Sequence, residues 1–87
     1  SKQEEAEKRK QQKTLTTALE RAERRMNQAS EHLEILEQKL AQEDLYRPES
    51  VETLNQLIKE RDLHAAELKE AENAWLEASD ALELLAQ

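Results

Sequence analysis

Residues 15–40 read LTTALERAERRMNQASEHLEILEQKL, and their apolar side chains recur at alternating steps of four and three residues. The apolar positions are Leu15, Leu19, Ala22, Met26, Ala29, Leu33, Leu36 and Leu40. An unbroken seven-residue repeat of this length is typical of a coiled-coil helix. Because a single helix cannot bury so narrow an apolar stripe, we expect a partner helix, and the second half of the chain supplies one.

The second half carries a similar stripe after a break at residues 43–48, EDLYRP. Pro48 cannot lie inside a helix but suits a first turn, so a second helix is predicted over about residues 48–85. Its predicted inward positions are Leu54, Leu57, Arg61, His64, Leu68, Ala71, Trp75, Ala78, Leu82 and Leu85, with Val51, Ile58 and Ala65 widening the stripe on one side.

A short connection between two long helices makes them antiparallel neighbours. We therefore predict an all-α fold, a two-helix antiparallel coiled coil, with residues 1–87 as one domain. The first helix is predicted over about residues 3–42 and the connection, which we call the tip, over residues 43–47. Facing residues then have numbers that sum to about 94, which places Trp75 beside Leu19.

The composition excludes several classes of protein. The chain has 87 residues with no glycine, one proline and 2% aromatic against 38% charged residues, so a sheet or a loop-rich fold is not expected. The absence of cysteine excludes disulfides and thiolate metal sites. No apolar run approaches the roughly 20 residues that span a bilayer, so we expect no membrane contact. Because the first residues resemble the middle of a charged helix, without a marked start, we expect a segment of a larger protein.

Charge is unevenly distributed along the chain. Residues 1–30 carry eight Lys or Arg and five Glu, a net charge of +3, whereas residues 31–87 carry five Lys or Arg and fifteen Asp or Glu, a net charge of −10. One exposed face of the first helix carries Lys10, Lys13, Arg21 and Arg24, which we call the basic stripe, with Arg25 on its flank. Aligned cations of this kind displace counterions from a nucleic-acid backbone. The alternative is a solvated face on which Glu20 pairs with Arg24.

Three residues of the tip, Leu45, Tyr46 and Arg47, are candidates for contact with a partner. Leu45 and Tyr46 have a second interpretation, in which their side chains fold back and cover the end of the helix pair. The two interpretations differ in whether these side chains are buried.

No group of residues predicts catalysis, a metal site or a cofactor site in this chain. His64 is predicted on the inward face and His32 on the flank near Asp62, and two histidines without a third converging ligand are weak evidence for a metal. The carboxylates alternate with Lys and Arg along helix faces, and no pocket is predicted around them. Arg61 is the one charged residue predicted on the inward face. Its side chain either extends outward to a carboxylate or, as a buried charge, fixes the register of the helices. Trp75 is interpreted as core rather than as a base-stacking platform.

The tip reads DLY at Asp44–Tyr46, and the second helix carries WLEA at Trp75–Ala78. Beside a first helix that bears Lys and Arg, these motifs resemble the C-terminal coiled-coil domain of the ABC-F ATP-binding proteins, in particular the Uup and YheS branch, over about residues 20–85. The resemblance implies a cytoplasmic bacterial protein that acts on ribosomes in translation. It also implies that two cassettes precede this segment and hold the ATP and Mg²⁺ of the parent ATPase.

For this segment the resemblance implies a non-catalytic arm that contacts ribosomal RNA or DNA and positions or regulates the cassettes. Because residues 31–87 are strongly acidic, we expect that contact at the basic stripe and Arg25. The rival interpretation is a self-association module, in which two hairpins form a four-helix bundle. The residues that would join them lie off the main stripes and are Ile35, Leu63, Leu76 and Leu84. We expect the chain to be a monomer rather than this four-helix bundle.

Overall fold

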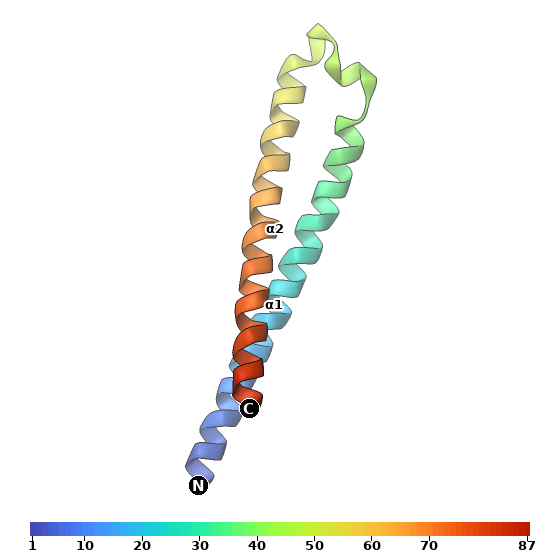
Figure 1. The fold of residues 1–87 in the computed structure, drawn as a ribbon. Helices are drawn as coiled ribbons and strands as arrows, with labels where there is room; N and C mark the ends of the chain where they lie inside the picture. Colours follow the sequence, from blue (N-terminus) through green and yellow to red (C-terminus); the bar gives the residue numbers. More distant parts are fainter.

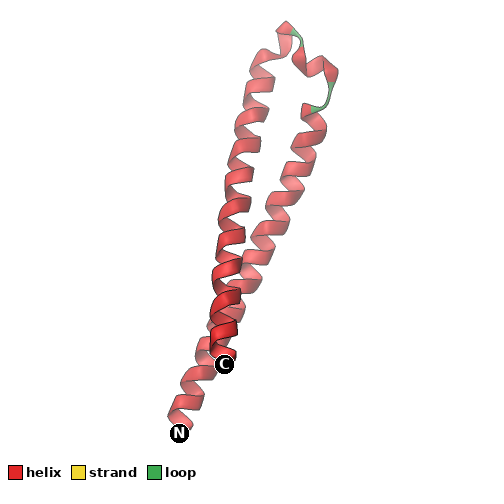
Figure 2. Cartoon of the chain, viewed as in Figure 1, coloured by secondary structure: helices red, strands yellow, loops and turns green.

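The computed structural model describes all 87 residues and contains helices but no strand. Two long helices, α1 (Lys2–Leu40) and α2 (Val51–Ala86), are joined by two short 3₁₀ helices, η1 (Glu43–Tyr46) and η2 (Pro48–Ser50). Figure 2 shows that the non-helical backbone between the long helices is confined to this connection. The expectation of an all-helical chain is therefore confirmed.

The two long helices lie side by side and run in opposite directions, which gives a rod of 70 × 15 × 15 Å (Figure 1). Contacts between them join His32 to His64, Arg25 to Glu67 and Glu23 to Trp75. The residue numbers of these three pairs sum to values between 92 and 98, close to the expected 94. The N-terminal turns of α1 extend past the end of α2 (Figure 1).

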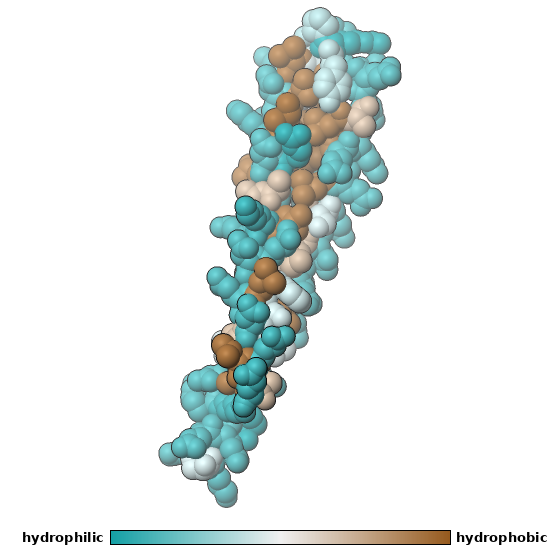
Figure 3. All heavy atoms as spheres, in the orientation of Figure 1, coloured by the Kyte–Doolittle hydropathy of each residue, from teal (hydrophilic) through white to brown (hydrophobic).

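The core is a thin line of small side chains. Its buried residues are Ala22, Ala29 and Leu36 of α1, Leu45 of η1, and Ala71 and Ala78 of α2. Alanines spaced by seven residues on both helices let the two backbones approach closely, since the distance between packed helices follows the size of the side chains at the contact. Larger residues such as Leu33, Leu57 and Leu68 are half-buried along the edges of this line. Apolar atoms follow the length of the contact, and the end that carries the N-terminus is hydrophilic (Figure 3).

The start of α1 is marked more clearly than the sequence interpretation allowed. The Ser1 hydroxyl accepts a hydrogen bond from the backbone N–H of Glu4 at 3.2 Å, and the Glu4 side chain accepts one from the Ser1 backbone nitrogen at 3.4 Å. This reciprocal pair is a capping box, which satisfies two of the free donors at a helix start. The prediction that no residue marks the start of this helix was wrong. It depended on the spacing of apolar residues and overlooked Ser1 and Glu4, whose spacing of three residues is that of a capping box.

The boundaries around the tip also differ from the prediction. Helix α1 ends at Leu40 rather than near residue 42, and α2 begins at Val51 rather than at Pro48. The intervening residues form the two 3₁₀ turns, and Pro48 opens η2 at the position where its missing N–H costs nothing. The tip is therefore longer and more ordered than a simple break in a helix.

Nine of the ten residues predicted on the inward face of α2 are buried or half-buried, Ala71 and Ala78 among them, and the exception is Arg61, which is exposed. Of the three residues predicted to widen the stripe on one side, Val51 and Ala65 are exposed and only Ile58 is half-buried, so that side was predicted wrongly. On the opposite flank Glu60, Glu67, Ala74 and Ala81 are half-buried instead. Around Ala71 and Ala78 that flank packs toward α1.

Candidate nucleic-acid interface

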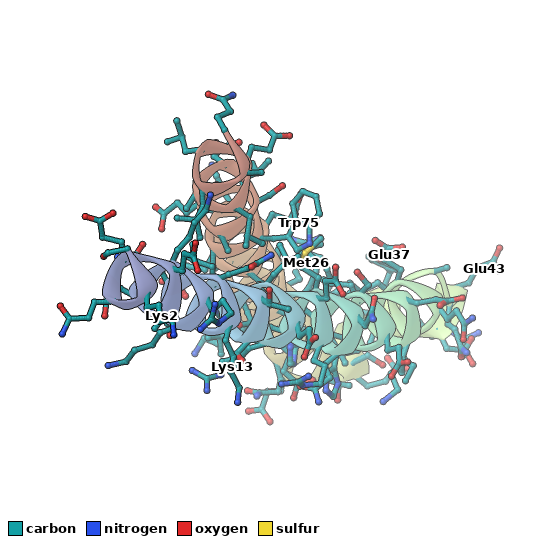
Figure 4. All side chains as sticks on the ribbon, turned by 90° about the horizontal axis from the view of Figure 1, so that it is seen from below. Lys2, Lys13, Met26, Glu37, Glu43 and Trp75 are labelled. Atoms are coloured by element: carbon teal, nitrogen blue, oxygen red, sulfur yellow. The ribbon has the colours of Figure 1, made fainter.

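The four residues of the basic stripe are all exposed on α1. At 3.6 residues per turn, Lys10, Lys13, Arg21 and Arg24 fall within an arc of about 80° around the helix axis. The buried residues Ala22 and Ala29 lie on the opposite side of the same helix. Figure 4 shows Lys13 projecting from the side of α1 that faces away from Met26 and Trp75. The stripe therefore points away from α2 and spans about 21 Å along the axis, at 1.5 Å per residue.

None of the four stripe residues forms an ion pair in the structure. The alternative pairing of Glu20 with Arg24 is not formed. One shallow surface depression is lined by Lys10, Lys13, Thr14, Thr17, Ala18 and Arg21. The Thr14 hydroxyl donates to the Lys10 carbonyl at 3.1 Å, so it follows the helix backbone and does not engage the stripe cations. These cations are free to exchange counterions for an external anion.

Arg25 differs from its four predicted companions. Its Nε donates to the Glu67 carboxylate at 2.6 Å, and its Nη2 lies 3.6 Å from the Glu70 carboxylate, so it joins α1 to α2. The hydrogen bond to Glu67 raises the pKa of Arg25 above its ordinary value, and partial desolvation opposes this. The side chain is half-buried against α2. Of the five predicted cations, the structure brings four together on the outer face and assigns Arg25 to the helix contact.

The partners of Arg25 were missed by the sequence analysis, although a signal was present. Added to 25, the residue numbers of Glu67 and Glu70 give 92 and 95, close to the sum of 94 expected for facing residues. Flanking positions of paired helices commonly carry ion pairs of opposite charge. A search for such pairs at the expected register would have identified them.

The three candidate residues of the tip differ in whether their side chains are buried. Leu45 is only 8% exposed and folds back against the helix pair, as one of the two interpretations predicted. Tyr46 is 60% exposed, and its hydroxyl donates to the Leu40 carbonyl at 2.6 Å, which satisfies a free acceptor at the end of α1. Arg47 is exposed and pairs with Asp44 at 3.1 Å. Of the three candidates, Tyr46 and Arg47 therefore present their side chains at the tip surface and Leu45 does not.

The Ser50 hydroxyl closes the tip from its other end. It donates to the Asp44 carbonyl at 3.0 Å, which ties the residue before α2 to η1. Together with the bond from Tyr46, this bond holds η1 against the ends of both long helices. The surface presented by the tip is thus a fixed arrangement of side chains.

The two histidines lie together across the helix pair. The imidazole rings of His32 and His64 are stacked with centroids 4.4 Å apart. His32 was predicted on the flank near Asp62, and its stacking on His64 was not predicted; the Asp62 carboxylate pairs with Arg61 at 3.1 Å. Nowhere in the chain do three or more His, Cys, Asp or Glu residues gather as they would around a metal ion.

Trp75 is half-buried rather than enclosed. Its indole Nε1–H donates to the Glu23 carboxylate at 3.1 Å, on a neighbouring part of α1. This bond fixes the indole edge against α1, so the ring is held between the helices and is not a free stacking platform.

Neither long helix combines the length and the apolar character that crossing a membrane requires. Comparison of the chain with protein-family models, with curated protein sequences and with solved structures found no match. The resemblance to the ABC-F proteins therefore depends on the residues quoted above.

Proposed function

We propose that this chain is the non-catalytic C-terminal coiled-coil arm of an ABC-F ATP-binding protein and that its basic stripe contacts a nucleic-acid backbone. The observation that carries the contact is four cations on one outer face of α1 with no ion-pair partner. Cations that are already paired gain little from a phosphate, whereas unpaired ones release counterions from the nucleic acid when they bind.

The proposed contact is with phosphates rather than with bases. Trp75 and Tyr46 are the only aromatic residues apart from the histidines, and neither lies on the basic stripe. Base stacking requires an aromatic platform at the binding face. The partner is therefore a duplex or a structured RNA approached through its backbone, either ribosomal RNA or DNA.

The charge distribution restricts how the partner approaches. Residues 31–87 carry a net charge of −10, and they include the whole of α2 and the tip. This acidic surface repels phosphate, whereas the basic stripe faces away from α2. We infer that the nucleic acid lies along the outer side of α1 in its N-terminal half.

The fold proposed for this arm is an antiparallel two-helix coiled coil that persists in solution as a monomer. The alternative is one unbroken rod that pairs with another copy. Energy transfer distinguishes them, because the chain has one tryptophan and no cysteine. With an acceptor on a Thr17→Cys variant, the hairpin places the dye near Trp75, whereas a continuous helix separates the two by about 87 Å at 1.5 Å per residue. Efficient transfer that persists in an excess of unlabelled chain supports the hairpin, and its absence contradicts it.

The wider role is to position or regulate the cassettes of the parent protein on the ribosome. ATP and Mg²⁺ would bind in those cassettes, and no residue of this arm is proposed to take part in hydrolysis. The sequence that precedes Ser1 in the full protein tests this assignment. A glycine-rich phosphate-binding loop and an ABC signature there would support it, and any other domain would contradict it.

The experiment on the contact is a titration of the chain with duplex RNA, duplex DNA and a single strand of equal length, at low and at high salt. We expect binding at low salt that weakens steeply as salt increases. Arg21→Glu/Arg24→Glu should lower the affinity at least about tenfold and reduce the number of released counterions by about two. The matched control is Lys59→Glu/Lys69→Glu on α2, which makes the same charge change away from the stripe.

Binding that is absent at low salt, or that responds equally to both double variants, would contradict the proposed interface. The comparison of the three nucleic acids at one salt concentration then decides between RNA and DNA. A preference for the single strand would contradict the phosphate-only contact.

A second candidate, self-association, has one observation in its favour. Ile35, Leu63, Leu76 and Leu84 are exposed large apolar residues, between 52% and 71% accessible. They are dispersed, because Leu63 and Leu84 lie about 31 Å apart along α2 at 1.5 Å per residue. Sedimentation over a range of concentrations tests this candidate: a dimer that is lost in Leu63→Gln/Leu84→Gln would support it, and a monomer at all concentrations would contradict it.

A further inference from the structure

Two imidazole rings form the only aromatic stack in the molecule, and the proposed function does not use them. The rings of His32 on α1 and His64 on α2 have centroids 4.4 Å apart and planes inclined by 16°. His64 is half-buried and His32 is exposed, so water and protons reach both rings. The stack connects the two helices near the middle of the rod.

One charged pair lies beside the rings. Arg25 of α1 and Glu67 of α2 line the same surface depression as both histidines. Their side chains are bonded to each other at 2.6 Å, and Glu70 lies 3.6 Å from the same guanidinium. The charge of Glu67 is therefore already balanced and is not available to neutralise a second proton on the rings.

The remaining charges near the stack come from the preceding turn of α2. Glu60 accepts a hydrogen bond from the Gln56 amide at 3.4 Å, and Arg61 pairs with Asp62. On α1, the residues three and four positions from His32 are uncharged: Gln28, Ala29, Ile35 and Leu36. Neither His32 nor His64 forms an ion pair with a carboxylate in the structure, so no such pair offsets the repulsion between two protonated rings.

We propose that the stacked His32–His64 pair is a proton-sensitive contact that weakens the pairing of α1 and α2 when both rings are protonated. Two neutral rings, or one neutral and one charged ring, stack favourably. Two charged rings at 4.4 Å are like charges held face to face between the helices. The unfolded chain carries no such constraint and takes up both protons freely.

The sign of the effect follows from proton counting. Where the folded pair binds fewer protons than the unfolded chain, the free energy of unfolding rises with pH. An ordinary imidazole has a pKa of about 6.5, so the stabilisation is present above that pH and is lost as the pH falls toward about 5. The other titrating groups in that range are carboxylates, and they require a control.

The first experiment compares thermal unfolding at pH 7.5 and pH 5.0, followed by circular dichroism. The control is the variant His32→Gln/His64→Gln, which keeps the size and polarity of the side chains and retains every carboxylate. We expect the Tm of the natural chain to fall by about 5 °C more than that of the variant on acidification. An equal change in both proteins would overturn the proposal.

The second experiment measures the protonation of the two imidazole rings directly, so it does not require that the variants fold equally well. Nuclear magnetic resonance of the imidazole protons between pH 4.5 and 8.5 should show two titration steps in the natural chain, separated by about one pH unit or more. His32→Gln and His64→Gln should each show a single step, because only one imidazole remains. Two rings that titrate independently, at the midpoints seen in the single variants, would overturn the proposal.

Discussion

The Arg25 guanidinium of α1 donates its Nε–H to the Glu67 carboxylate of α2 at 2.6 Å, while its neighbour Arg24 contacts no carboxylate at all. Two consecutive arginines thus face different environments. One lies in the contact between the helices, and the other lies on the outer face with the basic stripe. Sequence alone gives these residues the same chemistry, and only their angular positions on the helix separate them.

This separation predicts opposite phenotypes for the two arginines. Arg25→Gln should lower the Tm by a few degrees, because it removes a bond between the helices, and should leave nucleic-acid affinity nearly unchanged. Arg24→Gln should leave the Tm unchanged and weaken binding to a nucleic acid. Thermal unfolding and a binding titration on the same two proteins provide the measurement, and each variant is the control for the other.

Salt rather than pH is the variable to change in that experiment. Because the hydrogen bond to Glu67 raises the pKa of Arg25, the stabilisation is present throughout the neutral and mildly alkaline range and is lost only when the guanidinium deprotonates at extreme alkaline pH. Added salt screens the partly exposed pair at neutral pH. A Tm difference between Arg25→Gln and the natural chain that does not shrink with salt would contradict an electrostatic origin.

Ala71 is completely inaccessible, and its size determines how closely the helices approach. Ala71→Leu should reduce the free energy of unfolding by about 1–3 kcal/mol, because the added methyl and methylene groups have no space between the backbones. The matched control is Ala66→Leu, an exposed position on the same helix, which should change stability by less than about 0.5 kcal/mol. Urea denaturation measures both, and equal effects would contradict close packing at Ala71.

The alanines also explain which parts of the fold were predictable. The two long helices and their register follow from two apolar stripes and a break that contains Pro48. The inward stripe of α2 was predictable too, apart from Arg61, but the flank that widens it was assigned to the wrong side. In a pair of helices the smallest side chains determine the closest approach, and around Ala71 and Ala78 the flank with Glu67 and Ala74 packs toward α1, whereas Val51 and Ala65 are exposed.

The candidate site was predictable to a similar degree. Four stripe cations were placed correctly on one exposed face, because helical spacing alone determines that face. Arg25, at the edge of the same face, required knowledge of which flank of α2 packs against α1, because Glu67 lies on that flank. His64 was placed correctly on the inward face, and its stacking on His32 was missed because the expected sum of 94 placed Asp62 opposite His32.

Trp75 tests the helix contact with a side chain that is only half-buried. Trp75→Ala should reduce the free energy of unfolding by about 2 kcal/mol, less than the 3–5 kcal/mol typical of an enclosed tryptophan. Trp75→Phe keeps most of the apolar area and loses only the hydrogen bond to Glu23, so it should cost about 0.5–1 kcal/mol. Chemical denaturation followed by circular dichroism gives both values, and a natural stability for Trp75→Ala would contradict the pairing of the helices at this point.

The last prediction concerns the tip, where the Tyr46 hydroxyl donates to the Leu40 carbonyl at 2.6 Å. Tyr46→Phe removes this bond and leaves a carbonyl at the end of α1 to be satisfied by water, which should cost about 0.5–1 kcal/mol because the site is exposed. The loss should be local, so amide hydrogen exchange should accelerate at residues 38–46 and stay unchanged around Ala71. Phe retains the ring, and the variant therefore separates the hydroxyl from any apolar contact that Tyr46 offers to a partner. Exchange that accelerates along both helices would mean that the tip bond supports the whole helix pair rather than its end.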